Sequence, residues 1–466
     1  MAIEHSILGL PSTNKLRNKQ LVNESIRRRI IHSFPNGGAP LSALLAWAKI
    51  QPLNDVKHTW YEDIWQSARC KLRGKDPITS TAPSTGDADS GTAVAAGTFT
   101  TGSELWVKVD TVSRLAINDL IRLAKLDVIF RIVHVEKGVA NDVEKGFIKV
   151  MPVRAFTLDA SGIETIKAGT IIDVIGSAYA EGSGAGNARG MSYPCSIMNQ
   201  TQIFKEPYEF SGSALKMDLK FDATGPYSER AQEACRDHMV KIEKTLLFGQ
   251  RSTTFDANGK EIRTMSGILE FLKLWDKGAT GLTIDGSAYA PYDFKDESIS
   301  DDDSEKRYIT NSNGEVSIDR LERWLSNINL YHDSKTTDRL CLCGSGVVLA
   351  MSQMMRDQGS YTWEKGQDWM GVKCNRLITA MGDVIFMTHP LFNENPLYRN
   401  SALFLDIWSL NFRPLQDRDT KIIKNIQAND EDVRRDQWIT EGTLEFWKPM
   451  NHLFVENFSV YNKEAK

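Results

Sequence analysis

Several features that would mark a specialised class of protein are missing from this chain of 466 residues. No apolar run approaches the roughly eighteen residues that a membrane-spanning helix needs, so we expect no membrane span. The first residues, MAIEHSILGLP, lack a basic stretch followed by a long apolar one, so we expect no secretory signal. The six cysteines are scattered apart from Cys341 and Cys343, which argues against a disulfide framework and favours a reducing cytoplasm. The net charge of -4 excludes the basic surplus of a dedicated nucleic-acid-binding protein.

Motifs for catalysis, cofactor binding and metal binding are missing as well. None of the eight histidines pairs at the helical spacing of a zinc motif, and there is no Walker loop, nucleophile elbow or kinase signature. The glycine-rich segment 181–190 lacks the third glycine of a dinucleotide-binding loop, so we expect a flexible loop. Cys341 and Cys343 have no second pair to complete a metal site, and we expect buried thiols on a strand. These absences lower the expectation of an enzyme without excluding one, because catalytic groups can lie far apart in sequence.

A long amphipathic helix over residues 228–248 is the clearest signal in the chain. Ser228 is suited to cap its start, and Gly249 is suited to end it in the left-handed conformation. At about 1.5 Å per residue the rod is roughly 30 Å long. The apolar residues that recur every three or four positions are Ala231, Ala234, Cys235, Met239, Ile242 and Leu246. We expect His238 to be partly exposed and the charged face to be solvated. That face carries Arg230, Glu233, Arg236, Asp237, Lys241, Glu243 and Lys244.

Before this helix, the chain reads as a tail, a loop and a run of short strands. Residues 1–50 predict an extended tail with two helices, separated by the breaker PNGG. Residues 74–103 are rich in small and polar side chains, so we expect a loop with little to bury. From 104 to 176 the apolar period changes to two, in five short runs separated by turn segments such as VANDVEKG. About seventy residues of such a meander predict a small barrel or sandwich inserted as a unit.

After the helix, strands and shorter helices alternate. A hairpin over 253–265 and a short helix precede the loop-rich, acidic residues 276–314, whose Asp301–Asp303 run lacks the spacing of an EF-hand. Ser317 is placed to cap a helix over 318–332. A buried strand, a helix and further strands follow, and the end reads as two long strands around KPMN. Coarsely, the chain is α+β with one dominant long helix and antiparallel strands.

The order of these parts resembles the major capsid proteins of tailed bacteriophages, which have the Hong Kong 97 fold. It is most similar to the podovirus-type subgroup, in which a small β-domain is inserted in the extended loop. The resemblance rests on the joint order of its segments along nearly the whole chain. These segments are HTWYEDIW (58–65), IKAGTIIDVIGSAYAEGSGAG (166–186), NQTQIF (199–204), KIEKTLLFGQRS followed by RTMSGILEFL, and GTLEFWKPMNHLFVENFSV.

The resemblance implies an α+β capsid fold with a barrel-like insertion, and a structural role without catalysis, cofactor or metal. Copies of the chain would assemble as pentamers and hexamers, the pentons and hexons of an icosahedral shell around double-stranded DNA. The virion would be the final location, after assembly in the bacterial host cytoplasm. Implied partners are the chain itself, a portal protein, scaffold and decoration proteins, and packaged DNA bound without sequence preference, but no membrane.

The resemblance also implies a division into domains. The implied domains are an N-terminal arm (1–57), an extended loop (58–210) with the inserted β-domain at about 100–180, a peripheral domain (211–275 and 430–466, with the spine helix 228–248) and an axial domain (276–430).

Candidate contact residues lie in the arm and the extended loop, because neither segment can bury its own apolar side chains without partner chains. The aromatic anchors expected between subunits are Trp47, Trp60 and Trp65. A basic triplet on the first predicted helix is either a solvated face or a contact with DNA phosphate or with an acidic loop such as Asp301–Asp303. The triplet is Arg27, Arg28 and Arg29.

Two other functions stay open at this point. An encapsulin-like compartment shell would share the fold. A co-purifying cargo enzyme would favour that hypothesis, whereas the inserted β-domain and the long arm speak against it. The last hypothesis is a cytoplasmic enzyme of unknown type. A discrete monomer or dimer with a bound small molecule would favour it, and the lack of any convergent motif weighs against it.

Overall fold

The computed structural model describes Leu41 and, with gaps between them, residues 51–62, 69–84, 90–112, 115–123, 126–139, 142–159, 166–184, 186, 195–216, 226–277, 283–284, 287–288, 306–310, 315–329, 338–358, 362–369 and 372–460. Several expectations fall outside these residues: both N-terminal helices, and the residues Arg27, Arg28, Arg29, Trp47, Trp65 and Asp301–Asp303. None of the helices in the described ranges is both long and apolar enough to cross a membrane.

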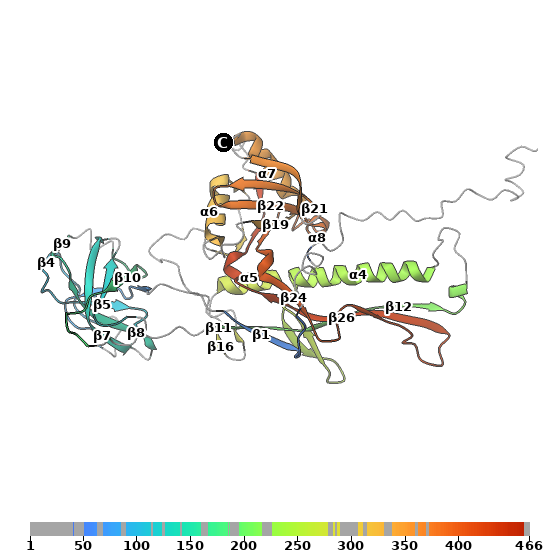
Figure 1. Ribbon diagram of the computed structural model, residues 1–466, viewed down its shortest axis with the longest axis horizontal. Helices are drawn as coiled ribbons and strands as arrows, with labels where there is room; N and C mark the ends of the chain where they lie inside the picture. The colour runs from blue at the N-terminus through green and yellow to red at the C-terminus, as the bar shows by residue number, and fades with distance from the viewer. Residues whose placement is uncertain are drawn as a thin grey trace, which may run out of the picture.

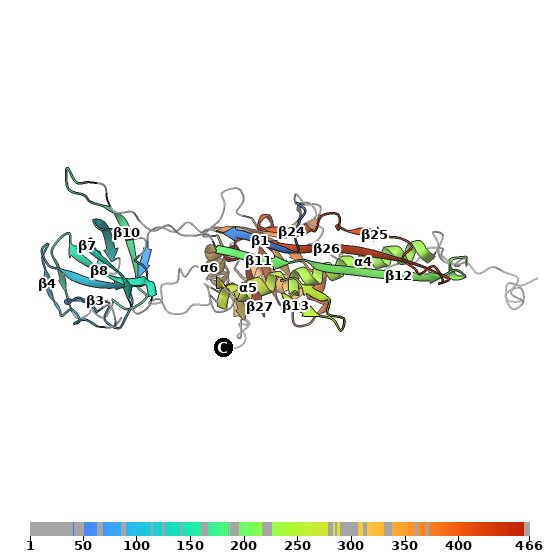
Figure 2. The same cartoon turned by 90° about the horizontal axis from the view of Figure 1, so that it is seen from below.

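The segment that alternates with a period of two folds as a small β-barrel, seen on the left of Figures 1 and 2. Its strands pair antiparallel in the order β2-β10-β6-β7-β8-β5-β3. A bridge between Leu72 and Val109 brings the end of β2 beside β5, which closes the sheet. Of the two expected forms, barrel and sandwich, the described strands have the closed order of a barrel. Its strands are β2 (Arg69–Lys71), β3 (Ile78–Thr79), β5 (Leu105–Val109), β6 (Asp119–Leu123), β7 (Val128–Val139), β8 (Asp142–Pro152) and β10 (Ile171–Ser177).

The barrel begins earlier in the chain than its alternating pattern. Residues 74–103, expected to be a loop with little to bury, supply β3 and also β4 (Gly97–Phe99), which pairs with β9 (Phe156–Leu158). Ile78 and Val94 are buried in the barrel core. The expectation of a loop with little to bury is therefore wrong. Ile78 and Val94 are isolated apolar positions in a polar segment, so they give no periodic signal, although both belong to the barrel core. The strands β7 and β8 likewise extend into VANDVEKG, which was expected to be a turn throughout.

A long helix lies along an elongated sheet, as Figure 2 shows. The helix α4 (Pro226–Phe248) matches the prediction, except that it starts at Pro226, so Ser228 lies in its first turn and is not the cap. In the sheet, β26 pairs with β12 on one side and with β24 and β25 on the other. We call these four strands the spine sheet. They are β12 (Gln202–Ser211), β24 (Leu410–Pro414), β25 (Lys421–Ile423) and β26 (Val433–Phe446).

The end of α4 corrects the expectation for Gly249. This residue does not have a positive φ. Instead, a Cβ atom there would lie 2.5 Å from Thr245 O and 2.7 Å from Met265 O. The chain returns against the helix end, and Gly267 N donates to Gly249 O at 2.9 Å. Glycine is needed for close backbone approach, which has no local sequence signal. Between these points lie the predicted hairpin and short helix: β13 (Ser252–Phe255), β14 (Glu261–Thr264) and α5 (Ile268–Lys277).

A second sheet forms the centre of a layered body, with α7 above it and α6 to its left in Figure 1. Its strands pair in the order β17-β27-β23-β19-β22-β21-β20, and we call it the body sheet. Cys341 and Cys343 are buried thiols on the α6–α7 side, as predicted, whereas Leu340 and Leu342 face the core shared with α4 and α5. Ser317 caps α6 as predicted, accepting from Arg320 N. The elements are β17 (Tyr308–Thr310), α6 (Ile318–Ile328), β19 (Arg339–Cys343), α7 (Ser345–Gln358), β20 (Thr362–Trp369), β21 (Val372–Thr379), β22 (Gly382–Thr388), α8 (Pro390–Glu394), β23 (Ala402–Leu405) and β27 (Leu453–Glu456).

The last strands do not form the expected pair of long strands. The long β26 belongs to the spine sheet, whereas the short β27 lies in the body sheet between β17 and β23. Between β23 and β27 the chain therefore crosses between the two sheets twice, after β23 and again after β26. Strands β24 and β25 consequently pair in the spine sheet, although residues 276–430 were expected to form the axial domain. The body sheet also contains the parallel pairs β19–β22 and β17–β27, so the strands are not all antiparallel.

Candidate assembly site

In sequence the barrel lies between β1 (Lys57–Glu62) and β11 (Cys195–Gln200), which pair antiparallel and which we call the neck. Backbone hydrogen bonds tie the base of the neck to the spine sheet. Leu53 N donates to Pro414 O at 2.8 Å, and Gln416 N donates to Leu53 O at 2.9 Å. Just beyond β11, Thr201 N donates to Val56 O at 2.9 Å. The position of the neck is thus set by the spine sheet.

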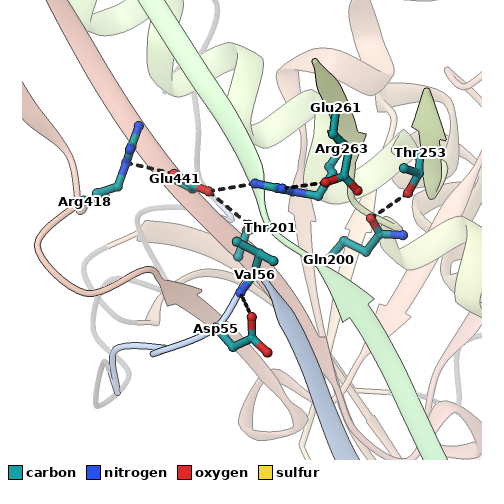
Figure 3. A network of polar contacts seen from close by, with 9 residues as sticks. All are labelled: Asp55, Val56, Gln200, Thr201, Thr253, Glu261, Arg263, Arg418 and Glu441. Atoms are coloured by element: carbon teal, nitrogen blue, oxygen red, sulfur yellow. Dashed lines mark hydrogen bonds and ion pairs between the residues drawn. The ribbon is translucent and has the colours of Figure 1, made fainter. Parts of the chain in front are cut away.

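Glu441 on β26 is the first of two buried carboxylates beneath the neck (Figure 3). Its side chain accepts from Thr201 Oγ1 at 3.1 Å and from Arg263 Nη2 at 3.5 Å, and pairs with Arg418 Nε at 2.8 Å. Arg263 also pairs with Glu261 at 3.2 Å. A buried carboxylate is strongly unfavourable unless it is paired. Because its three partners come from separate segments, Glu441 holds the neck, the β13–β14 hairpin and the loop after β24 in one arrangement.

Glu445 lies on the same face of β26, four residues further along. His58 Nε2 on β1 is 3.3 Å from its Oε1, Trp447 Nε1 donates to Oε1 at 2.9 Å, and Arg413 Nε donates to Oε2. Burial alone would raise the pKa of Glu445, but hydrogen bonds from His58, Arg413 and Trp447 bring it below its ordinary value. Glu445 is therefore a charged residue that joins β1 to β24 through β26.

Glu62 closes the far end of β1 against the turn after β26. Its Oε1 accepts from the backbone N of Lys448 and from Trp60 Nε1, both at 3.1 Å. Burial raises the pKa of Glu62 to about 7, although these two hydrogen bonds and the charge of Lys448 act to lower it. The like charge of Glu445 adds to the rise. This contact of the neck therefore titrates near neutral pH.

Trp60, expected between subunits, is packed in the core of its own chain. It is 7% exposed and its ring lies 6.1 Å from Phe271 of α5. Trp60 therefore helps to fix the neck to the body of its own chain. The next residue, Tyr61, points to the other face of the strand and is 70% exposed.

Two buried polar residues on α4 were missed by sequence reasoning. His238, expected to be partly exposed, and Glu243, expected on the solvated face, are both 0% exposed. His238 Nε2 lies 2.7 Å from Thr440 Oγ1 on β26, and burial lowers the pKa of this imidazole. A signal was available for His238, since it lies four residues from both Ala234 and Ile242 on the apolar stripe. Glu243 carries a similar signal, since it lies four residues after Met239 and three before Leu246, but its partners are distant in sequence.

Exposed apolar side chains mark surfaces that the described chain leaves uncovered. On the β13–β14 hairpin, Phe255 is 70% exposed and Ile262 is 49% exposed. Trp408, between β23 and β24, is 64% exposed. A two-stranded hairpin is marginally stable without a packed face. These aromatic and aliphatic side chains are therefore suited to contact another protein surface.

The contacts of Glu441, Glu445 and Glu62 beneath the neck, which we call the joint, are structural: they hold the neck in place. Charged hydrogen bonds and ion pairs fix the neck. Within the described ranges, no three His, Cys, Asp or Glu side chains gather so that they could hold a metal ion.

Comparison with known proteins gives one family. Residues 11–459 match the model of a family described as SU10 major capsid protein. No curated protein matches the chain significantly.

Three of the solved structures that resemble the chain do so distantly. That of Mycobacterium phage Bobi is 8% identical, with a TM-score of 0.39 over 93% of this chain and 92% of the other. That of Mycobacterium phage Patience is 11% identical, with a TM-score of 0.38 over 61% and 79%. The holo-SrpI encapsulin complex from Synechococcus elongatus is 9% identical, with a TM-score of 0.36 over 58% and 78%. At these scores the structures add nothing to the family match.

Proposed function

Since this chain belongs to the SU10 major capsid protein family, we propose that its copies assemble into the pentons and hexons of an icosahedral phage head around double-stranded DNA. The family match over residues 11–459 carries this proposal. The role is structural, so we expect neither catalysis nor a cofactor. The proposal extends to location in the virion, assembly in the bacterial host cytoplasm, and contacts with portal, scaffold and decoration proteins.

The architecture supports a division into domains like that of the Hong Kong 97 fold. In this proposal residues 1–57 are the N-terminal arm, and the extended loop runs out along β1 and back along β11, carrying the barrel. The peripheral domain comprises α4 and the spine sheet. The axial domain comprises the body sheet with α6 and α7. Strand pairing favours assigning β24 and β25 to the peripheral domain and β27 to the axial domain, and also moving β12 from the extended loop to the peripheral domain.

The joint beneath the neck supports an assembly role. A loop that reaches a neighbouring subunit must leave its own subunit in a defined direction. Glu441 and Glu445 fix that direction by joining the neck to β26 through buried charges. The uncovered side chains of Phe255, Ile262 and Trp408 further suit a subunit that is completed by its neighbours.

Electron microscopy and light scattering of the purified chain, with and without neighbouring viral genes, test the proposal. We expect closed shells, or rings of five and six subunits, in at least one preparation. A stable monomer or dimer in both preparations, with a bound small molecule, would contradict it. Shells that copurify with one cargo enzyme and no DNA would favour the compartment hypothesis.

The basic triplet of the arm has a separate test. We propose that Arg27, Arg28 and Arg29 contact DNA phosphate or an acidic surface of a neighbouring subunit. Replacing all three with Ala should lower the yield of filled heads or their DNA content, measured by particle counting and by absorbance of purified heads. Unchanged yield together with unchanged DNA content would remove the triplet from the assembly mechanism.

A further inference from the structure

A buried polar contact joins three segments that lie far apart in the sequence. Glu243 Oε1 on α4 accepts hydrogen bonds from the backbone N of Leu41 and from His389 Nε2, both at 2.8 Å. All three residues are 0% exposed. In the described part of the chain, Leu41 is the one residue that precedes residue 51. This contact is therefore where the described structure ties the N-terminal segment to the body.

His389 is held in one orientation from several sides. Its Nδ1 accepts from Leu391 N at 3.2 Å, so Nε2 carries the hydrogen and donates to Glu243. Its backbone N donates to Cys343 O at 2.8 Å, at the end of β19. Its ring centroid lies 5.3 Å from that of Phe392. The carboxylate of Glu243 is thus oriented by the body sheet as well as by α4.

The site is incomplete without the N-terminal segment. A buried carboxylate is stable only when donors surround it, and the backbone N–H of Leu41 is one of them. The side chain of Leu41 belongs to the same buried cluster as Ile242, Leu246 and Phe392. Removing Leu41 would therefore leave a polar oxygen with one donor fewer and would uncover apolar surface.

We propose that Glu243 and His389 form an anchor that holds the N-terminal arm at Leu41 of the same chain, and that shell assembly depends on this anchor. The second half rests on the proposed function, whereas the anchor itself is a property of the subunit. Fixing Leu41 against α4 sets the point from which residues 1–40 reach a neighbouring copy. Glu243 and His389 are positioning residues, which act through the arm and need not touch the neighbour.

Hydrogen exchange of the full-length chain tests the anchor. The probe is the Leu41 amide, followed by mass spectrometry of the peptide that contains it, in wild type and in Glu243→Gln. The matched control is Glu233→Gln, which changes a carboxylate on the exposed face of α4 with a side chain 42% exposed. We expect exchange at Leu41 to be about 10-fold faster in Glu243→Gln, because the amide oxygen still accepts from Leu41 N but without the charge that strengthens the bond, and unchanged in Glu233→Gln. Peptides from the rest of α4 should keep their wild-type rates.

A second variant keeps the test decisive if Glu243→Gln does not fold. Leu41→Ala retains the backbone donor but removes the buried side chain from the segment, so it too should speed exchange at residue 41. Both anchor variants should lower shell yield several-fold, and Glu233→Gln should not. Unchanged exchange at residue 41 in both variants would overturn the anchor. Faster exchange with wild-type shell yield would overturn its role in assembly. If even the wild type forms no shells, the proposed function fails while the exchange rates still decide the anchor.

Discussion

Two carboxylates at the neck, Glu445 and Glu62, differ in how tightly they hold a proton, and the difference follows from their donors. Glu445 has donors from His58, Arg413 and Trp447, which outweigh burial and lower its pKa. Glu62 has one backbone donor and one indole donor, which do not outweigh burial. Glu62 is therefore the residue of the neck through which pH should act.

Glu62 should make the folded chain more stable in mild acid. Burial raises the pKa of Glu62 from 4.5 to about 7, so between these values the folded state binds a proton that the unfolded state releases. This stabilisation is present at low pH and is lost as the pH rises through about 7. The free energy of unfolding should fall by about 2–3 kcal/mol through this group between pH 5 and pH 7.5. Denaturant unfolding at several pH values measures it.

Two substitutions isolate this effect. Glu62→Gln keeps an acceptor for Trp60 and Lys448 but cannot titrate, so its unfolding free energy should depend less on pH than that of wild type. Glu209→Gln is the control, since Glu209 is a 57% exposed side chain paired with Arg435 at 2.6 Å. Equal pH slopes for wild type and Glu62→Gln would show that Glu62 does not set the dependence.

For single residues, the sequence predicted burial only where apolar side chains recur at the spacing of a helix or a strand. Cys341 and Cys343 were predicted as buried thiols because they alternate within an apolar strand. Trp60 was assigned to a neighbour because its own core includes Phe271, a partner distant in sequence. Glu243 and the neck carboxylates were missed for the same reason, since each is defined by donors from segments that only the fold brings together.

At the scale of elements, the turn after α4 is held by close contact between backbones. Gly249→Ala should destabilise the chain by about 2–3 kcal/mol, because its Cβ would meet Thr245 O at 2.5 Å and Met265 O at 2.7 Å. Gly102→Ala is the matched control, since a Cβ there meets nothing within 4 Å. Thermal unfolding of both variants tests this. Equal melting temperatures for the two variants would mean that the turn accommodates the added Cβ without loss of stability.

Element types were predicted better than their ends and partners. The 3.6-residue period gave α4 and α6, and the period of two gave the barrel strands. The strands β3 and β4 were missed because each is too short to show a period. The assignment of β27 to the body sheet also had no local signal, because pairing partners such as β17 and β23 are set by the chain crossings.

At the scale of the whole molecule, the barrel should be separable from the rest. Its two ends lie side by side, since Arg69 on β2 pairs with Asp173 on β10, and it has its own buried core. Replacing residues 69–177 with a short Gly/Ser linker should leave the melting temperature of the remainder within about 3 °C of wild type. In calorimetry, the linker variant should lack the unfolding transition of the barrel and keep that of the remainder.

Expression of residues 69–177 alone is the complementary measurement. It should give a cooperative unfolding transition with a β-type circular dichroism spectrum. Loss of cooperative unfolding in the linker variant would show that the barrel is needed to fold the body.

Because the chain crosses between its two sheets after β23 and after β26, strands from late in the sequence complete both sheets. This order affects when a newly synthesised subunit can finish folding. The strand at the centre of the spine sheet, β26, and the strand between β17 and β23, β27, are synthesised after the strands that they join. Until β26 has been made, the spine sheet lacks its central strand, and Glu441 and Glu445 are not yet in place beneath the neck; the body sheet then still lacks β27. The contacts that fix the neck are therefore among the last that a growing chain can form.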